Sequence, residues 1–362
     1  MGKLLFRAED LKNFVVRYFL TLGIPETDAR TVAEVLVAAD MRGVDSHGVI
    51  RIDSYYGSRL RRGMISTKPE IKVVAETAST LALDGGAGLG HVVGVYAMNR
   101  AIEKARESGS AIVTVRNSNH YGIAGYYAMM ALPHDMIGIS YTNSQPLVAP
   151  TYGKTAVLGT NPIAVAVPAM EEKPYVLDMA TSIVPIGRIT VYDKSGKEIP
   201  EGWGIDGEGK VTRNPGEVLN GGALMPLGGV DLMRGYKGYG LGMLVDIFSG
   251  VLSGAAFLTS VGMPGTNLPA NVGHYFAAMR VDAFRPVDEF KAEMDRMIRE
   301  LKDAPKAVGQ ERIYIPGEKE YELTEKSLRD GVPLLEEVAA VLKKAAEAAG
   351  LPFDLPVVGR ID

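Results

Sequence analysis

Histidine is scarce in this sequence, and one of its five copies stands where a side chain could exchange a proton. His120 lies in the polar segment Asn117–Gly122, directly after the apolar run Ala111–Arg116, which is typical of a strand. Imidazole has the unperturbed pKa nearest neutrality, so it can protonate a carbonyl oxygen and recover the proton in the reverse reaction. A histidine that is simply hydrogen-bonded in a turn is the alternative, but the neighbouring amides and hydroxyls favour a catalytic role.

A second group of polar residues, Arg42–Arg51, contains an imidazole and a guanidinium that could bind one small anion. If His47 to Arg51 is helical, both side chains project from one face at positions i and i+4. The planar guanidinium fork suits a carboxylate because it donates two parallel hydrogen bonds. The alternative is a helix start capped by Ser46, with Arg51 in a surface ion pair.

Three further segments place polar groups beside flexible backbone. Leu158–Pro162 and Leu177–Ser182 end apolar runs, and backbone N–H groups at such a point could bind a phosphate or a carboxamide. Lys237 opens a long apolar segment, where it could meet a phosphate or solvent. Ordinary turn and cap chemistry is the alternative for each segment alone.

Several well-known sites are excluded. The sequence has no cysteine, so it has no disulfide, thiolate nucleophile or sulfur-bound zinc. It also lacks the H-E-x-x-H pattern of zinc proteases, and we expect chemistry without a metal. The one G-x-G-x-x-G match, Gly202–Gly207, lies in a polar stretch with Pro200 before it and no apolar helix after it, so we interpret it as a turn and not as a Rossmann fingerprint.

The spacing of apolar residues predicts two domains. Helical periodicity covers Ala8–Leu22 and Glu26–Met41, and it returns in Pro286–Lys302 and Val332–Ala348, so residues 1–70 and 286–362 are predicted to form a helical domain from both chain ends. Residues 71–285 are predicted to form an α/β domain. Its strand-like runs are separated by unequal segments, which favours a mixed sheet over regular βαβ winding. The strand-like runs are Ile71–Leu83, Ala111–Arg116, Met136–Thr142, Ile163–Pro168 and Tyr175–Asp178. A helix is predicted between the first two, over His91–Ser108.

Two segments of the α/β domain depart from this pattern. Asp193–Pro215 is polar and rich in glycine and proline, so we expect an excursion from the core. Tyr239–Met263 is apolar enough to resemble a membrane span, but Asp246 would be costly in lipid. We therefore expect a buried helix there that could contact another subunit.

Charge and composition narrow the partners. The formal net charge is −4, and no run of basic residues could follow a phosphate backbone, so nucleic acid is not an expected partner. The first residues carry no apolar core typical of a signal peptide. We expect a cytoplasmic protein that does not enter a membrane.

Together these motifs resemble the malate/L-lactate dehydrogenase family, which includes sulfolactate and ureidoglycolate dehydrogenases. The likeness runs in order over nearly the whole chain, through Arg42–Gly48, Asn117–Gly122, Thr142–Pro146, Leu158–Pro162, Asp178–Ser182, Lys237–Leu241 and Pro316–Glu318. It implies an α/β fold of non-Rossmann type, in which a central mixed-sheet domain binds NAD or NADP and a helical domain is built from both chain ends. It also implies a homodimer with the active site near the interface.

The resemblance further implies the roles of individual residues. His120 would donate and accept the proton, while His47 and Arg51 would hold the substrate, with Tyr121 and Thr160 beside it. The residues that match the family's cofactor positions are Ser144, Thr160, Asn161, Asp178, Met179, Ala180, Lys237, Pro316, Gly317 and Glu318.

The chemistry implied is hydride transfer between NAD(P) and a small 2-hydroxy acid, with malate and oxaloacetate first. L-lactate, sulfolactate and imino acids remain alternatives, as does a non-catalytic scaffold. The proton could also belong to His47 instead of His120. The sequence does not decide between NAD and NADP, because it lacks the usual fingerprint.

Overall fold

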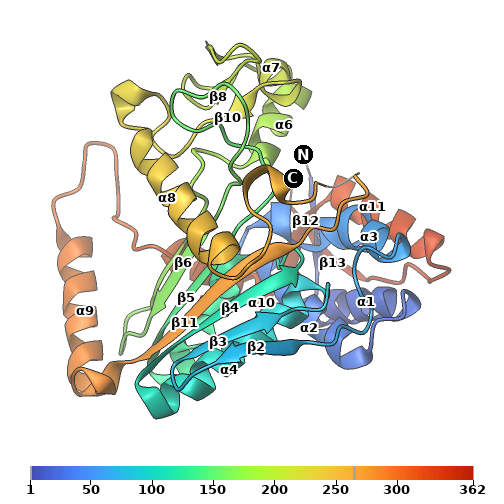
Figure 1. Ribbon diagram of the computed structural model, residues 1–362. Helices are drawn as coiled ribbons and strands as arrows, with labels where there is room; N and C mark the ends of the chain where they lie inside the picture. The colour runs from blue at the N-terminus through green and yellow to red at the C-terminus, as the bar shows by residue number, and fades with distance from the viewer. Residues whose placement is uncertain (1, 264–265, 362) are drawn as a thin grey trace.

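A mixed seven-stranded sheet forms the centre of the protein (Figure 1). The computed structural model describes residues 2–263 and 266–361. Of the neighbouring strand pairs in this sheet, only β3 and β4 are parallel, and the others are antiparallel. In spatial order the strands are β2 (Lys72–Glu76), β3 (Thr80–Asp84), β4 (Ser110–Ser118), β11 (Val272–Arg280), β5 (Met136–Thr142), β6 (Ile163–Val167) and β7 (Tyr175–Met179). The predicted mixed sheet of non-Rossmann type is confirmed, because a Rossmann sheet is mostly parallel.

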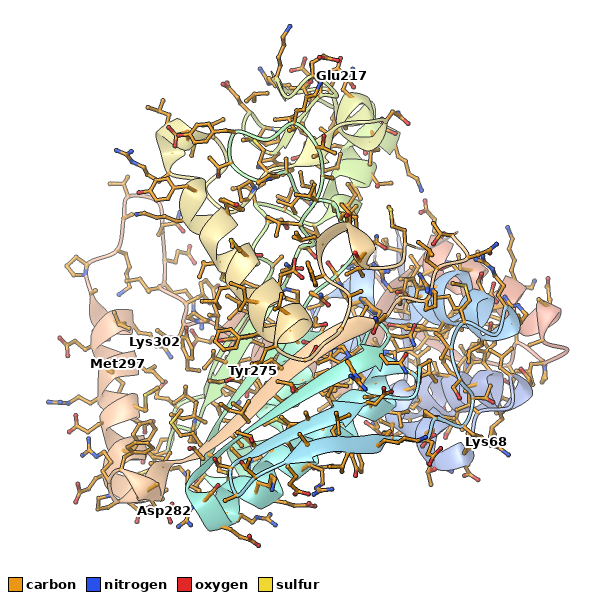
Figure 2. The ribbon with its side chains drawn as sticks, viewed as in Figure 1. Lys68, Glu217, Tyr275, Asp282, Met297 and Lys302 are labelled. Carbon is orange, nitrogen blue, oxygen red and sulfur yellow. The ribbon has the colours of Figure 1, made fainter. Side chains whose placement is uncertain are left out.

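Helices α4 (Gly90–Ser108) and α5 (Ala124–Met129) pack on one face of this sheet. The strands alternate in burial, as in β5, so every second side chain enters the core beneath these helices. Val113, Tyr127 and Phe276 are fully buried there. On the opposite face, Tyr275 of β11 packs against Phe248, with ring centroids 5.0 Å apart (Figure 2).

The helical part brings the two chain ends together (Figure 1). It contains α1 (Ala8–Thr21), α2 (Glu26–Met41), α3 (Ser58–Arg61), α10 (Glu318–Asp330) and α11 (Glu336–Ala348). Strand β1 (Lys3–Phe6) lies between β12 (Val332–Leu335) and β13 (Val357–Ile361), antiparallel to both. The apolar faces of α1, α2 and α11 meet in one core.

This region differs from the prediction in two respects. Residues 332–335, expected to begin a helix, form β12 instead, because they pair with β1. Helix α9 (Val287–Asp303) does not pack on the N-terminal helices, as was expected. Its Ile298 packs with Ala169 and Ile315. Lys302 on the same helix lies on the side of α9 that faces the rest of the protein (Figure 2). The carboxylate of Asp295 on α9 accepts the backbone N–H groups of residues 170–172. The predicted boundaries of the two domains stay a prediction.

A small upper lobe with its own apolar core stands above the sheet (Figure 1). It holds α6 (Ile186–Lys194), α7 (Pro215–Leu219) and the strands β8 (Gly204–Ile205), β9 (Val211–Thr212) and β10 (Ala223–Leu224). The predicted excursion 193–215 falls in this lobe, and Ile199 within it is fully buried. The polar stretch is thus partly anchored in an apolar core.

The long apolar segment is not one buried helix. Helix α8 (Tyr236–Asp246) continues as a π-helical turn, Ile247–Val251, and the chain then turns at Gly254. Several of its large apolar side chains are exposed, including Leu244, Ile247 and Val251. Across the described residues, no helix is both long and apolar enough to span a membrane.

Candidate active site

Two adjoining cavities lie where the helical part meets the carboxyl end of β4. The larger one measures about 500 Å³ and the smaller about 180 Å³. Six residues line both: Ser46, His47, Gly122, Thr160, Pro162 and Pro185. The two cavities therefore adjoin, and a ligand in one could meet a ligand in the other.

His120 reaches the smaller cavity because β4 ends at Ser118, two residues before it. Its Nδ1 lies 2.6 Å from the hydroxyl of Tyr56 and 3.3 Å from the backbone nitrogen of Gly122. Both groups can donate to Nδ1, which leaves Nε2 for other contacts. Tyr56 comes from the helical part, so the orientation of this ring depends on how the two parts pack.

His47 and Arg51 reach the same cavity through a tight kink and not through one helix. Two short 3₁₀ turns, Asp45–His47 and Val49–Arg51, flank Gly48, whose backbone is extended. The predicted i, i+4 helical spacing is therefore wrong. The kink is held by the buried carboxylate of Asp40, which accepts the Val49 backbone N–H at 2.8 Å.

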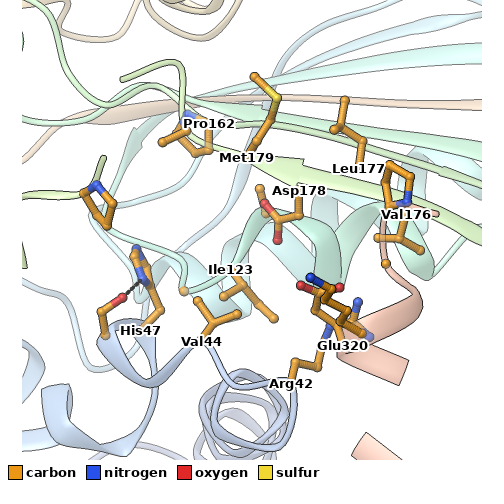
Figure 3. A pocket seen from close by; sticks show the side chains of 18 of the residues that line it. Arg42, Val44, His47, Ile123, Pro162, Val176, Leu177, Asp178, Met179 and Glu320 are labelled. Atoms are coloured by element: carbon orange, nitrogen blue, oxygen red, sulfur yellow. Dashed lines mark hydrogen bonds between the residues drawn. The ribbon is translucent and has the colours of Figure 1, made fainter. Parts of the chain in front are cut away.

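The two imidazoles stack, with ring centroids 5.3 Å apart and planes at 24°. The Nδ1 of His47 lies 2.9 Å from the Ser46 hydroxyl (Figure 3). Burial lowers the pKa of His47 to about 3, and the positive charge of Arg51 adds to that shift. Burial and then Arg51 also hold the pKa of His120 well below its ordinary value. Both rings are therefore neutral at pH 7 while no anion is bound.

Among the residues that the structure describes, the contacts of Arg51 come from Ser46 and Tyr55. Its Nε donates to the backbone oxygen of Ser46, and its guanidinium lies 5.9 Å from the centre of the Tyr55 ring. Both Arg51 and Tyr55 line the smaller cavity. The outer guanidinium nitrogens are thus placed to bind a carboxylate there.

Tyr121, the residue after His120, is buried together with His274. Their rings stack at 4.6 Å, and the Tyr121 hydroxyl lies 3.0 Å from that of Ser140. The ring nitrogens of His274 contact the hydroxyls of Ser118 and Thr142, each at 2.8 Å. Tyr121 also lines the smaller cavity, but its hydroxyl already has a partner, and its substrate role stays a prediction.

Most of the predicted cofactor residues line one of the cavities. Thr160 lines both, Ser144 lines the smaller one, and the larger one is lined by Asp178, Met179, Ala180, Pro316 and Gly317. The hydroxyl oxygen of Ser144 accepts the backbone N–H of Thr160 at 3.0 Å, so these two segments are joined.

The other three predicted cofactor residues, Asn161, Lys237 and Glu318, do not line either cavity. Asn161 is fully buried, and its side-chain oxygen accepts the backbone N–H of Ser144. Glu318 is buried in ion pairs with Lys302 and Arg312, and Lys237 is exposed on the first turn of α8. Asn161 can support the site from behind.

The structure also explains Asp246, the charge within the apolar segment. Its carboxylate accepts hydrogen bonds from the side chains of Asn143 and Asn161, at 2.9 and 3.2 Å. These two amides precede and support the loops that carry Ser144 and Pro162. Asp246 therefore holds the site loops together.

The sequence alone did not identify Asp40, Arg42, Tyr55 and Tyr56. Arg42 was quoted only as part of a motif, although it lines the larger cavity. Tyr55 and Tyr56 follow Arg51 by four and five residues, and this spacing was the available signal. The contact of Tyr56 with His120 joins residues 64 positions apart, so no local pattern could have shown it.

The fold and the site together define a class of α/β proteins that carries its polar site between a mixed sheet and a helical part, outside the Rossmann group. The family model of malate/L-lactate dehydrogenase matches residues 6–343. The chain belongs to this family.

Individual relatives agree along almost the whole chain. A malate dehydrogenase of Pyrococcus abyssi (strain GE5 / Orsay) is 51% identical over 345 residues, which is 95% of this chain and 94% of that protein. An L-sulfolactate dehydrogenase of Methanocaldococcus jannaschii is 38% identical over 97% of this chain and 99% of its own length. Among solved structures, malate dehydrogenase from Pyrococcus horikoshii OT3 superposes with a TM-score of 0.90, at 45% identity and 97% coverage of both chains.

Proposed function

We propose that the protein is an oxidoreductase that interconverts a small 2-oxo acid and its 2-hydroxy acid, oxaloacetate and malate first, with NAD or NADP as the hydride carrier. The observation that carries this proposal is the convergence of Arg51, His47 and His120 on the smaller cavity, which adjoins the larger one. The name of the Pyrococcus abyssi relative supports malate as the first substrate to test.

The polar groups of the smaller cavity match a 2-oxo acid. The fork of Arg51 can hold the substrate carboxylate through two hydrogen bonds, and His47 can contact the same molecule. A bound anion beside the imidazoles opposes the effect of Arg51 and favours the protonated ring. His120 can then give its Nε2 proton to the substrate oxygen and take it back in the reverse direction, with His47 as the alternative donor.

The larger cavity has the size and lining of a ligand pocket, and we assign it to the cofactor. Its volume lies within the range of ligand pockets, and apolar side chains such as Ile123 and Met179 line it together with a few polar groups. A bound reduced nicotinamide supplies the hydride. We assign Ser144, Thr160, Asp178 to Ala180 and Pro316 to Gly317 to contacts with it. Lys237, Asn161 and Glu318 stay a prediction from the resemblance.

A homodimer in the cytoplasm completes the proposal. The exposed apolar side chains of α8 support a subunit contact on this face. The absence of cysteine is compatible with a reducing compartment.

A substrate panel tests the proposed function. We expect the protein to oxidise NADH or NADPH with oxaloacetate, faster than with pyruvate, sulfopyruvate or a cyclic imino acid. A chelator should leave this activity unchanged, since the described residues hold no cluster of three or more metal-binding side chains. The same panel compares the two cofactors and so decides between them. A preference for another acid would change the substrate, whereas no activity and no binding of either cofactor would favour the scaffold alternative.

Arg51→Lys tests the substrate side separately. A lysine keeps the charge but loses the planar fork, so kcat/KM for oxaloacetate should fall roughly 10- to 100-fold, the loss of one charge-assisted hydrogen bond or more. The affinity for reduced cofactor, measured by its fluorescence, should stay near the wild-type value. Arg30→Lys, which pairs with Glu26 on the surface of α2, is the matched control. Equal losses in both measurements would place Arg51 outside the substrate pocket.

A further inference from the structure

One end of the larger cavity presents a guanidinium and two carboxylates to the interior (Figure 3). Arg42 comes from the C-terminal end of α2, Asp178 from the end of β7 and Glu320 from α10. These three residues line the larger cavity only, whereas Arg51 and His120 line the smaller one. They give this part of the cavity a charge pattern of its own.

Arg42 is a buried cation that has no close anionic partner among the described residues. Arg42 is 8% exposed, and its guanidinium lies 5.2 Å from the centre of the Tyr321 ring. Within residues 2–263 and 266–361, no carboxylate oxygen lies within 4.0 Å of it, and Glu320 and Asp178 act on it from a longer distance. Burial lowers its pKa, although Tyr321, Glu320 and Asp178 oppose that shift.

Such a cation carries a cost that the surrounding protein does not fully offset. Removing a charge from water is costly, and an opposite charge repays that cost only when it lies close and in good geometry. The Tyr321 ring, the carbonyl end of α2 and the more distant carboxylates of Glu320 and Asp178 each offset only part of this cost. A guanidinium held in this way, at a cavity wall, is therefore suited to bind an anionic group of a ligand.

Asp178 adds a second kind of contact. One of its oxygens accepts the backbone N–H of Gly125 at 2.8 Å, and the residue is open to the cavity. Burial of the carboxyl group in the surrounding protein raises the pKa of Asp178 to about 6. Its second oxygen can accept a hydrogen bond from a hydroxyl. A ligand that fits this end thus carries an anion close to hydroxyl groups, as a phosphorylated ribose does.

We propose that Arg42 binds a phosphate of the dinucleotide, beside the ribose that Asp178, already assigned to the cofactor above, would hold through a hydrogen bond. The assignment rests on the cofactor function proposed above. The phosphate could be the bridging diphosphate, common to NAD and NADP, or the 2′-phosphate, found only in NADP. Both are phosphate esters next to a ribose, and the guanidinium suits either.

Calorimetric titration of the whole protein distinguishes the bridging diphosphate from the 2′-phosphate as the group that Arg42 binds. The probes are ADP-ribose, which has the diphosphate, adenosine 2′-monophosphate, which has the 2′-phosphate, and adenosine, which has neither. In Arg42→Met, we expect the Kd of one phosphate probe to rise roughly 10- to 100-fold, since a hydrogen bond to a charged group is lost. Adenosine binding should not change. Arg42→Lys should recover part of the affinity because it restores the charge.

The pattern of losses decides the assignment. A loss for ADP-ribose alone identifies the diphosphate, and a loss for adenosine 2′-monophosphate alone identifies the 2′-phosphate. Equal losses for all three probes, or none for either phosphate probe, would overturn the role of Arg42. Arg30→Met, on the exposed surface of the same helix, is the control, and thermal melting shows whether each variant is folded. Wild-type protein that binds none of the probes, and neither intact cofactor, would instead overturn the proposed cofactor itself.

Discussion

Two neutral imidazoles beside a guanidinium are the central feature at the scale of single residues. Burial and Arg51 push the pKa values of His47 and His120 down, so neither ring is charged at pH 7 while the site lacks an anion. A substrate carboxylate adds a negative charge near the rings and raises these pKa values again. The substrate thereby helps to protonate the group that must donate the proton to it.

His120→Ala should lower turnover by roughly 10²- to 10⁴-fold, the usual contribution of a positioned acid or base. Cofactor affinity should change little, whereas the melting temperature should fall modestly, because the hydroxyl of the fully buried Tyr56 loses its partner. His134→Ala, at an exposed histidine that contacts Arg106 just before the start of β5, is the control.

The pH profile of the wild-type protein belongs to the same prediction. Reduction needs the protonated ring, and its pKa in the free enzyme lies below 6.5, so kcat/KM for oxaloacetate should already fall with rising pH below that value. Oxidation of malate needs the neutral ring and should stay level above pH 6.5. If His120→Ala kept its turnover while His47→Ala lost both turnover and this pH dependence, the proton would belong to His47.

At the scale of elements, the kink at Gly48 positions two of the substrate groups. A Cβ atom at Gly48 would lie 2.0 Å from the nearest carboxylate oxygen of Asp40, which holds the kink through Val49. Asp40 is 1% exposed, and burial raises its pKa well above the ordinary value. The carboxyl group therefore cannot move aside into water.

Gly48→Ala should destabilise the fold by about 1–3 kcal/mol, the usual cost of overpacking, and should displace His47 and Arg51. We expect a lower melting temperature together with a raised KM for oxaloacetate. Gly207→Ala is the matched control, since its Cβ would meet its nearest neighbour at an ordinary 3.5 Å. A Gly48→Ala protein with wild-type stability and KM would show that the turn can relax without moving the site.

The elements also show what a sequence pattern can predict. The strand-like run at 111–116 was correctly placed because its alternating burial is local to β4. The pairing of β1 with β12 and β13 was missed because it joins chain segments more than 300 residues apart. Arg51 and His120 were found from residue type and spacing, whereas the helical spacing to His47 failed at Gly48. Tyr56 was missed because its contact with His120 exists only in the folded protein.

At the scale of the whole molecule, the two chain ends form one layer. Strand β1 would be an unpaired edge without β12 and β13, and both partners come from the last 31 residues of the chain. This layer packs with α2, whose C-terminal end carries Arg42 and leads into the kink at Gly48. The position of the substrate groups therefore depends on residues at both ends of the sequence.

Helix α8 and the π-helical turn after it expose large apolar side chains on what we call the α8 face, and we expect a second copy of the chain to cover this face. Leu244, Ile247, Val251 and Leu252 are 37%, 45%, 56% and 58% exposed. Exposed apolar side chains that lie together in this way mark interaction sites more often than free surface. The double variant Leu244→Glu/Val251→Glu should therefore shift the protein from dimer to monomer in sedimentation velocity. Its melting temperature should fall as well, since subunit association stabilises the folded chain.

Leu328→Glu, which introduces the same charge at a 66% exposed leucine of α10, is the control for the dimer prediction. It should leave the sedimentation coefficient unchanged, because α10 belongs to the helical part and not to the α8 face. The active-site cavities share Pro185, one residue before α6 of the upper lobe, and Tyr239 of α8 packs against the core of that lobe, so loss of the dimer should also reduce turnover. A double variant that remained a dimer would move the subunit contact to another face of the molecule.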